Sequence, residues 1–402
     1  MLLKNNYRVK VLNTINFKKS MHYNPLVYIR SEKDILKLVN TIILNTKGEG
    51  QQSGEDFWVK AEKLYYTALI GYIWYECVEE EQNFTTLLDM INASEAREDD
   101  EEFKNPVDLM FDELEEREPE HFAVKQYKKY KLAAGKTAKS ILVSAAVRLA
   151  PFNLPQIKAI TDHDDMDLYT LGEKKCALYA VIPDNDTTFN FLVSLLYSQI
   201  FQALYYCADQ IHHGALPCHV HFILDEAPSV NLPGLPRELA TMRSRNISCS
   251  TIIQNMAQIK ELYKDSWETI PGNSDTLLYL GGNESSTHKY ISEALGKSTI
   301  DTKTHGQTKG RSGSYSTNFQ MSGRELLTPD EVRMLDNRYC ILFIRGARPV
   351  LDLKYELMEH PAIRYTMDGG APPYIHHGTA TPTLPGEPLF RFDQNDEKEN
   401  IA

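Results

Sequence analysis

No stretch of the sequence matches the phosphate-binding pattern G-x-x-x-x-G-K-[ST]. The nearest approach is Gly135-Lys136-Thr137, but Tyr130 stands where the pattern needs its first glycine, and the residues in front are polar and helical instead of forming a strand. Such a loop supplies the backbone N–H groups that cradle a β-phosphate and the lysine that neutralises it. The 402 residues therefore lack the main phosphate-binding element of a nucleotide hydrolase.

The sequence also lacks spaced cysteine pairs and an export signal. Its six cysteines show no metal-ligand spacing and lie mostly in apolar runs, which is typical of buried thiols in a reducing compartment. They are Cys77, Cys176, Cys207, Cys218, Cys249 and Cys340. The first six residues, Met1-Leu-Leu-Lys-Asn-Asn6, contain no apolar segment of a signal peptide.

Long hydrophobic runs are scarce as well. The apolar segment from Leu64 to Val78 is too short to cross a membrane. The segment from Asn190 to Ala208 is long enough, but its four polar side chains suit a helix buried in protein better than one in lipid: Ser194, Ser198, Gln199 and Gln202. We expect this chain by itself to be soluble, without a transmembrane segment.

Negative charge is concentrated in one segment. The stretch from Glu95 to Glu120 holds thirteen acidic and three basic residues, and so carries most of the net charge of −12. The remainder is nearly neutral, which is compatible with a nucleic-acid-binding surface elsewhere. The acidic segment itself is either a solvated helix face or a docking surface.

The most informative stretch that is present runs from Val220 to Leu224 and then into Asp225 and Glu226. The apolar, partly β-branched run has the length of a buried parallel strand. In a mononucleotide-binding α/β fold, ligands lie at the carboxyl ends of such strands. An aspartate there holds the water shell of Mg²⁺, and a glutamate beside it orients and deprotonates an attacking water, as in the Walker B motif of ATP-driven motors. The simpler alternative is a strand that runs into two acidic loop residues.

Strands and helices alternate from Lys175 onward, which indicates a parallel α/β sheet. We predict that one mostly parallel sheet holds Asp225 and Gln254 at the same edge and consists of residues 7–12, 175–182, 220–224, 247–253, 277–280 and 340–344. Residues 57 to 149 show only helical patterns, among them a helix from Ala123 to Leu149, and predict an all-α insertion. Residues 299–322 are rich in Ser, Thr, Gly and Lys and predict a mobile loop.

These patterns divide the chain into four parts. Residues 1–50 begin the α/β domain, residues 51–150 form the all-α domain, and residues 151–365 complete the α/β domain. Residues 366–402 are rich in Pro and Gly and then polar, and we expect a disordered tail.

Several motifs in series resemble those of the TraG/TraD-type coupling proteins of type IV secretion. They are Ile223-Leu-Asp-Glu226, Met242-Arg-Ser-Arg-Asn-Ile-Ser248, Ile252-Ile-Gln254 with the helix up to Tyr263, Phe57-Trp58-x-x-Ala61-Glu-x-Leu64, Leu278-Tyr-Leu-Gly-Gly282, Leu326-Leu-Thr-Pro-Asp-Glu331 and Ile344-Arg-Gly346. The resemblance covers most of the chain. It implies a RecA-like P-loop NTPase core interrupted by an all-α domain, in a hexameric ATPase that brings relaxase–DNA complexes to a conjugation channel and pumps DNA.

The resemblance also implies roles for single residues. Asp225 would hold the Mg²⁺ of MgATP through water, Glu226 would activate the hydrolytic water, and Gln254 would sense the γ-phosphate. Arg243 and Arg245 would reach a neighbouring subunit's nucleotide as arginine fingers, or else belong to a solvated helix end. Asn255-Met-Ala-Gln258 and Pro228 depart from the usual pattern of the family.

In this family a membrane-spanning N-terminus and the phosphate-binding loop precede the first strand seen here, so the resemblance implies a truncated form of a protein that lies on the cytoplasmic side of the membrane. We therefore expect this chain alone to be inactive toward ATP. Two alternatives stay open: an ATP-independent fragment that binds the relaxosome, and a double-stranded DNA translocase of the chromosome-partitioning type. Local basicity in the predicted loop makes three residues candidate DNA contacts: Lys303, Lys309 and Arg311.

Overall fold

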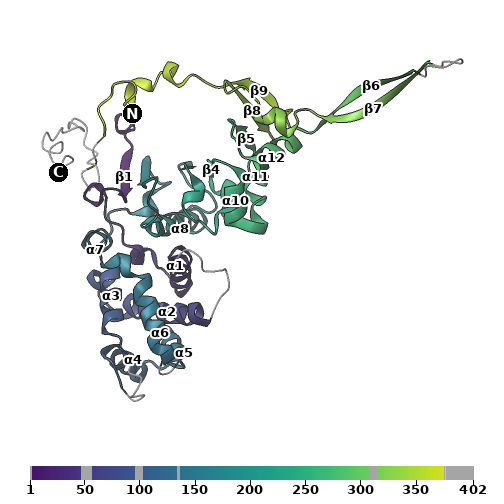
Figure 1. Cartoon of the computed structure of the whole chain (residues 1–402). Coiled ribbons are helices and arrows are strands. Elements are labelled where there is room, and N and C mark those ends of the chain that lie inside the picture. The colour runs from purple at the N-terminus through teal and green to yellow at the C-terminus, as the bar shows by residue number, and fades with distance from the viewer. Residues whose placement is uncertain are drawn as a thin grey trace.

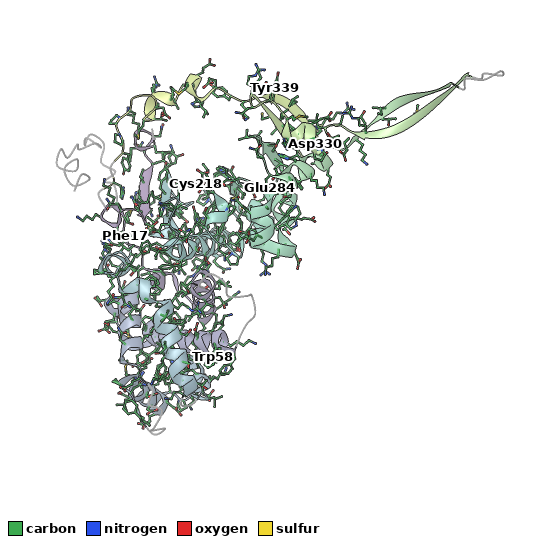
Figure 2. All side chains as sticks on the ribbon, in the orientation of Figure 1. Phe17, Trp58, Cys218, Glu284, Asp330 and Tyr339 are labelled. Carbon is green, nitrogen blue, oxygen red and sulfur yellow. The ribbon has the colours of Figure 1, made fainter. Side chains whose placement is uncertain are left out.

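The computed structural model describes residues 2–46, 57–95, 103–133, 136–307, 315–374 and 376. A helical part and an α/β part lie one below the other, and a long ribbon formed by β6 and β7 extends away from both (Figure 1). In Figure 2, Trp58 lies on the helical part, whereas Cys218 and Glu284 lie on the α/β part. The helical part is a continuous insertion between the first two strands, β1 (Arg8–Asn13) and β2 (Cys176–Val181).

The helical part is built around α2 (Phe57–Glu76), which the sequence predicts as a strongly apolar helix from Phe57 to Val78. Tyr65, Tyr66 and Leu69 of α2 are fully buried, and the rings of Phe111 and Tyr127 stack at 3.9 Å beside them. The surrounding helices are α1 (Glu32–Asn45), α3 (Phe84–Ala93), α4 (Pro106–Arg117), α5 (Phe122–Lys131), α6 (Lys136–Arg148) and α7 (Pro155–Thr161).

The prediction of one helix from Ala123 to Leu149 is wrong, because the structure divides it into α5 and α6. The first helix ends at Lys131, and the second begins at Lys136. Gly135 itself lies outside the described residues. Thr137 stands in the first turn of α6, so the Gly-Lys-Thr sequence does not follow a strand and is not part of a phosphate-binding loop.

The α/β part contains two parallel strand pairs. In the first pair Arg8 of β1 lies opposite Cys176 of β2, and in the second Val220 of β3 (Val220–Leu224) lies opposite Ile247 of β4 (Ile247–Thr251). The remaining helices of this part are α8 (Asn190–Tyr206), α9 (Leu235–Thr241), α10 (Met256–Tyr263), α11 (Thr269–Gly272), α12 (Ser285–Leu295) and α13 (Pro329–Arg333).

The prediction that all these strands form one mostly parallel sheet is wrong. The strands β5 (Thr276–Tyr279), β8 (Tyr339–Ile344) and β9 (Val350–Leu353) form a separate antiparallel sheet. A short connection at Gly346, whose φ is 82°, turns β8 back into β9, and so short a link permits only antiparallel pairing. Among the described residues, β4 pairs only with β3 and β5 pairs only with β8, so each leaves one edge unpaired.

The buried helix α8 covers one face of the β3–β4 pair. The ring of Phe201 on α8 stacks on Phe222 of β3 at 4.5 Å. Within the described residues, α8 with its π-helical extension to Ile211 is long and apolar enough to cross a membrane, but 72% of its most apolar window is buried in the fold. Such burial is typical of a core helix.

The opposite face of the β3–β4 pair is open. Ile223 of β3 is 64% exposed, and Ile252, just after β4, is 47% exposed. Parallel strands are normally covered on both faces, so the described residues build only part of the layer structure that this sheet needs.

The prediction of a mobile loop at residues 299–322 is also wrong. The strands β6 (Lys297–Gln307) and β7 (Tyr315–Glu325) pair antiparallel along their whole length, with Lys297 opposite Glu325 and Gln307 opposite Tyr315. The ribbon projects away from the core, so it needs no apolar alternation, and threonine favours its extended backbone (Figure 1). The predicted disordered tail lies mostly outside the described residues, and the domain boundaries remain predictions.

Candidate functional site

The tips of β3 and β4 place the acidic pair and the glutamine at one edge. Parallel pairing continues just past the strands, because Ile252 donates its backbone N–H to Leu224 at 3.0 Å and Ala227 donates to Ile252 at 3.1 Å. Asp225 and Gln254 therefore lie at the same carboxyl edge, as the sequence predicts. Glu226 has a left-handed backbone with φ of 51°, a conformation that non-glycine residues adopt mainly in functional or tightly held turns.

Gln254 contacts Glu226 directly. Its side-chain Nε2 donates a hydrogen bond of 3.1 Å to Oε1 of Glu226. The backbone of Gln254 is held in turn by Gln258, whose Oε1 accepts from the Gln254 N–H at 3.3 Å. Asn255 caps α10 by accepting from the Gln258 N–H at 3.1 Å, so the unusual Asn255-Met-Ala-Gln258 sequence has a local structural role.

A pocket of about 420 Å³ opens beside the acidic pair. It is bounded by the carboxyl end of β2, by Val193 and Tyr197 of α8, and by Asp225 and Glu226. Asp184, three residues after the end of β2 at Val181, also lines it and was not among the predicted site residues. Its signal in the sequence is the same as that of Asp225, an acidic residue just after a predicted strand.

The two arginines lie at the opposite end of β4. Arg243 and Arg245 belong to a 3₁₀ turn (Met242–Arg245) just before the strand, about 17 Å from its carboxyl end if each of the five residues adds roughly 3.3 Å. Neither arginine therefore belongs to the edge that carries Glu226 of the same chain. Any contact with a nucleotide would have to be made across an interface between subunits.

Only one of these arginines is free to extend. Arg245 makes a bidentate ion pair with Asp209, with both N–O distances at 2.8 Å, and its guanidinium lies over the ring of Tyr205 at 4.5 Å. The hydrogen bonds to Asp209 raise the pKa of Arg245. Arg243 is exposed to solvent. The internal ion pair favours Arg243 over Arg245 for a role outside its own subunit.

Of the three predicted DNA contacts, the structure places only one, Lys303. Lys303 belongs to β6, opposite Phe319 of β7. Lys309 and Arg311 lie outside the described residues, so the structure does not place them. All three residues remain predictions.

The side chains at this edge provide part of what a nucleotide-binding site needs. Carboxylate oxygens at Asp225 and Glu226 are the hard ligands that Mg²⁺ prefers. The described residues at this edge include no glycine-rich loop and no lysine that would neutralise phosphate, in agreement with the sequence pattern. The arrangement can hold an ion and orient a water, but it cannot by itself cradle a triphosphate.

Comparison with known proteins decides the family. The sequence profile of the family described as type IV secretory system conjugative DNA transfer matches residues 3–356. The chain belongs to this family. The match includes both strand pairs, the helical insertion and the β6–β7 ribbon.

Curated relatives include VirD4 proteins. The chain is 30% identical over 211 residues to protein VirD4 of Rhizobium radiobacter, which is 50% of this chain and 29% of that protein. It is 25% identical over 199 residues to VirD4 of Agrobacterium fabrum strain C58, again covering 29% of the relative. The matched segment thus spans less than a third of the length of these relatives.

Solved structures confirm the RecA-like α/β fold with its helical insertion. The unbound form of the bacterial conjugative coupling protein TrwBΔN70 superposes with a TM-score of 0.62 at 15% identity, covering 88% of this chain and 76% of that one. TrwB in complex with ADP and Mg²⁺ superposes with a TM-score of 0.60 at 15% identity and the same coverage.

Proposed function

We propose that this chain is the part of a conjugative coupling ATPase that activates water and carries the helical domain. The supporting observation is the hydrogen bond between Gln254 and Glu226 at the carboxyl edge of β3 and β4, next to Asp225. Family membership and the nucleotide complexes of TrwB agree with it. In the full-length form the protein would use ATP to bring a relaxase–DNA complex to a type IV secretion channel, at the cytoplasmic side of the membrane, and to pump DNA.

Each residue at the edge has a distinct task in this proposal. Bound MgATP would supply the phosphoryl group and the ion that neutralises its charge. Asp225 would hold that Mg²⁺ through water. Glu226 would orient the attacking water and accept its proton, and Gln254 would keep the Glu226 carboxylate turned toward it by the hydrogen bond from Nε2.

The phosphate cradle would come from polypeptide that packs on the unpaired edge of β4 and on the open face beside it. A strand next to β4 would end at the same carboxyl edge as Glu226 and Gln254, provided that it runs parallel. A helix after it would cover Ile223 and Ile252, which are exposed in the described part of the chain. Removal of such a strand–loop–helix unit would explain both the unpaired edge of β4 and the open face beside it.

Assembly would complete the site from a second side. We propose a homohexamer in which Arg243 of one subunit reaches the nucleotide of the next, since Arg245 is already engaged by Asp209. An arginine supplied in this way stabilises the charge that develops during phosphoryl transfer.

A second candidate function is an ATP-independent fragment that binds the relaxosome. The observation in its favour is the helical part, which has a buried core of its own around Tyr65, Tyr66 and Leu69. In that case the helical part would bind a relaxase with the same affinity whether or not the nucleotide site is complete.

The experiment that separates the two candidates adds the strand–loop–helix unit of a full-length relative in front of Met1. The ATPase proposal predicts DNA-stimulated hydrolysis by this extended protein and its loss in Glu226→Gln, with ATP binding preserved. Absence of both binding and hydrolysis in a folded extended protein would leave only the relaxosome-binding role.

A further inference from the structure

Two chain segments connect the sheet with the helical part, and they run side by side. One leaves β1 and passes through His22 and Tyr23, and the other returns from α7 toward β2 through Asp162 to Asp165. The Tyr23 N–H donates to the Ile160 carbonyl at 2.6 Å, and the Asp165 N–H donates to the His22 carbonyl at 3.0 Å. The backbone thus fixes residue 22 against residue 165 at the junction.

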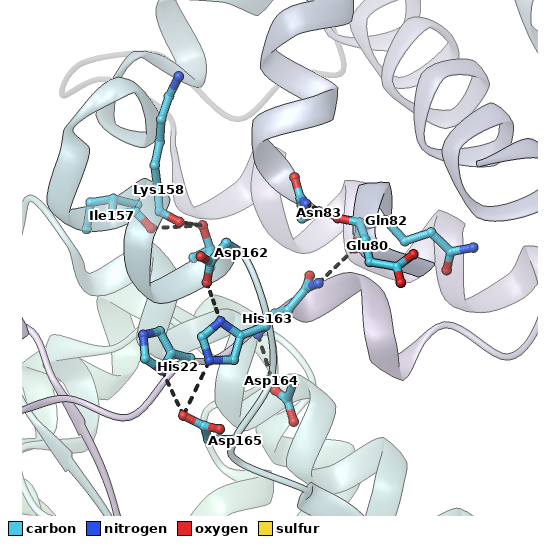
Figure 3. Close-up of polar contacts among 12 residues, drawn as sticks. His22, Glu80, Gln82, Asn83, Ile157, Lys158, Asp162, His163, Asp164 and Asp165 are labelled. Atoms are coloured by element: carbon cyan, nitrogen blue, oxygen red, sulfur yellow. Dashed lines mark hydrogen bonds and ion pairs between the residues drawn. The ribbon is translucent and has the colours of Figure 1, made fainter. Parts of the chain in front are cut away.

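The side chains at this junction form a cluster of metal-ligating groups. Figure 3 shows the imidazoles of His22 and His163 beside each other and the carboxylate of Asp165 facing both. Nδ1 of His22 lies 2.7 Å and Nε2 of His163 lies 3.7 Å from Oδ2 of Asp165, and the rings are 3.8 Å apart. One ligand atom from each of the three residues falls within 4.8 Å of the others.

We propose that His22, His163 and Asp165 bind a divalent transition-metal ion, with Zn²⁺ as the reference ion. Two imidazole nitrogens and one carboxylate oxygen are a donor set that suits zinc and exclude a preference for Mg²⁺, which takes oxygen ligands. The ion would be three-coordinate from the protein, with water in the fourth position, because the three side chains are between about a third and a half exposed.

A fourth residue orients one of the ligands. Nδ1 of His163 is hydrogen-bonded to Oδ1 of Asp162 at 2.6 Å (Figure 3). In the neutral tautomer that donates from Nδ1 to Asp162, the Nε2 lone pair of His163 is directed at the lone pairs of Asp165 Oδ2. Metal-ligating histidines commonly have this arrangement of a carboxylate on the far nitrogen. A cation bound between Nε2 of His163 and Oδ2 of Asp165 would remove the repulsion between these lone pairs.

Small side-chain movements convert the cluster into a tetrahedral site. Bonds of about 2.0–2.1 Å to zinc place neighbouring ligand atoms roughly 3.3 Å apart. The contact between His22 and Asp165, at 2.7 Å, would have to open, and that between His163 and Asp165, at 3.7 Å, would have to shorten. Both changes are below about 1 Å. One imidazole would also have to turn out of the stack, because rings 3.8 Å apart and inclined by 31° do not direct both nitrogens at one ion.

The surrounding structure holds these ligands in place. Asp164, next to Asp165, accepts hydrogen bonds from the Tyr28 hydroxyl and from the Asn24 and Asp167 N–H groups. Lys10 of β1 donates to the carbonyl of Asp167 at 2.9 Å and to Thr170 at 2.7 Å. Because Asp164 is occupied in this way, it is not a fourth ligand. A bound ion would tie together the two segments that join the helical part to the sheet.

To test this proposal, the purified 402-residue chain is titrated with Co²⁺, whose visible absorption reports its coordination. The bound Co²⁺ is then displaced with Zn²⁺. We expect one equivalent bound, no competition by Mg²⁺, and a higher Tm with Zn²⁺, since the ion binds only the folded chain. His163→Ala and Asp165→Asn should weaken binding at least about tenfold, and Asp162→Asn, which removes only the orienting carboxylate, should weaken it less.

The matched control is His212→Ala. His212 makes an ion pair with Glu173 outside this cluster, so its removal deletes a histidine of the same kind without touching the proposed ligands. This variant should bind Co²⁺ like the unmodified chain. Circular dichroism without metal establishes that each variant is folded. Absence of saturable binding by the unmodified chain, or unchanged binding by folded His163→Ala, would overturn the proposal and leave the cluster as a set of histidine–aspartate contacts without a metal.

Discussion

Gln254 donates a hydrogen bond of 3.1 Å to Glu226, and this bond joins the tips of two parallel strands. It places an amide donor on one oxygen of the carboxylate proposed to activate water. The other oxygen then faces away from Gln254, so the orientation of the base depends on a residue 28 positions later in the chain.

We predict that Gln254→Ala lowers kcat for ATP in the extended protein while KM changes little. A general base contributes roughly 10²–10⁴-fold, and losing its orientation should remove about tenfold to hundredfold of this. The measurement is steady-state hydrolysis. Gln258→Ala is the comparison variant: it removes the bonds of Gln258 to the backbone N–H and to the side-chain oxygen of Gln254 but leaves the bond to Glu226, so it should lower kcat less. Equal kcat for Gln254→Ala and the parent would argue against a positioning role.

The helical part contains a buried ion pair that should dominate its stability. Glu62, 1% exposed, accepts from Arg148 Nε at 2.8 Å and also bonds Ser144. Arg148, 8% exposed, donates in addition to the Thr46 carbonyl at 3.1 Å and so ties α6 to the end of α1.

We predict that Glu62→Gln destabilises the helical part by about 3–5 kcal/mol, because it leaves the guanidinium of Arg148 buried without a counter-charge. Guanidinium-induced unfolding followed by circular dichroism measures the change. Asp112→Asn, which breaks an exposed pair with Lys104, should cause no measurable change. Comparable effects of the two substitutions would contradict the assignment of the buried pair.

The β6–β7 ribbon gives a prediction about DNA. If Lys303, Lys309 and Arg311 contact phosphates in the channel of a hexamer, replacing all three by Ala should lower the slope of log K against log salt by about 2–3. Replacing three exposed lysines of α5, Lys125, Lys128 and Lys129, removes the same charge far from the ribbon and should leave the slope unchanged. Equal slopes for the ribbon variant and the parent would remove the proposal.

Local signals predicted most individual elements. The apolar run ending in Asp225 and Glu226 and the capped helix after Gln254 lie where their patterns indicate, since strand length and capping depend on neighbours in sequence. Which strands pair with each other was harder to predict from the sequence. The separation of β5 from β4 and its pairing with β8 depend on contacts between segments far apart in sequence, which the residues of β5 do not predict. The β6–β7 ribbon was missed because a ribbon away from the core has no apolar alternation to detect.

In the site, too, local features could be predicted from the sequence, whereas tertiary contacts could not. The edge that holds Asp225, Glu226 and Gln254 follows from parallel strand ends, which sequence can predict. The ion pair of Arg245 with Asp209 depends on tertiary packing and has no distinctive sequence pattern. Asp184 follows a predicted strand as Asp225 does, but only the tertiary structure shows that it lines the pocket. The cluster of His22, His163 and Asp165 joins residues 143 positions apart, a distance over which sequence reasoning alone sees no pairing.

The central claim is that this chain holds the water-activating half of an ATPase site and lacks the phosphate cradle. A single preorganised donor at a reaction centre is worth roughly 3–4 kcal/mol, so loss of a whole cradle should abolish turnover. The direct test is ATP hydrolysis by the purified 402-residue chain beside its Glu226→Gln variant, which controls for contaminating ATPases. We predict the same background rate for both. Clear hydrolysis by the unmodified chain that disappears in Glu226→Gln would contradict the account.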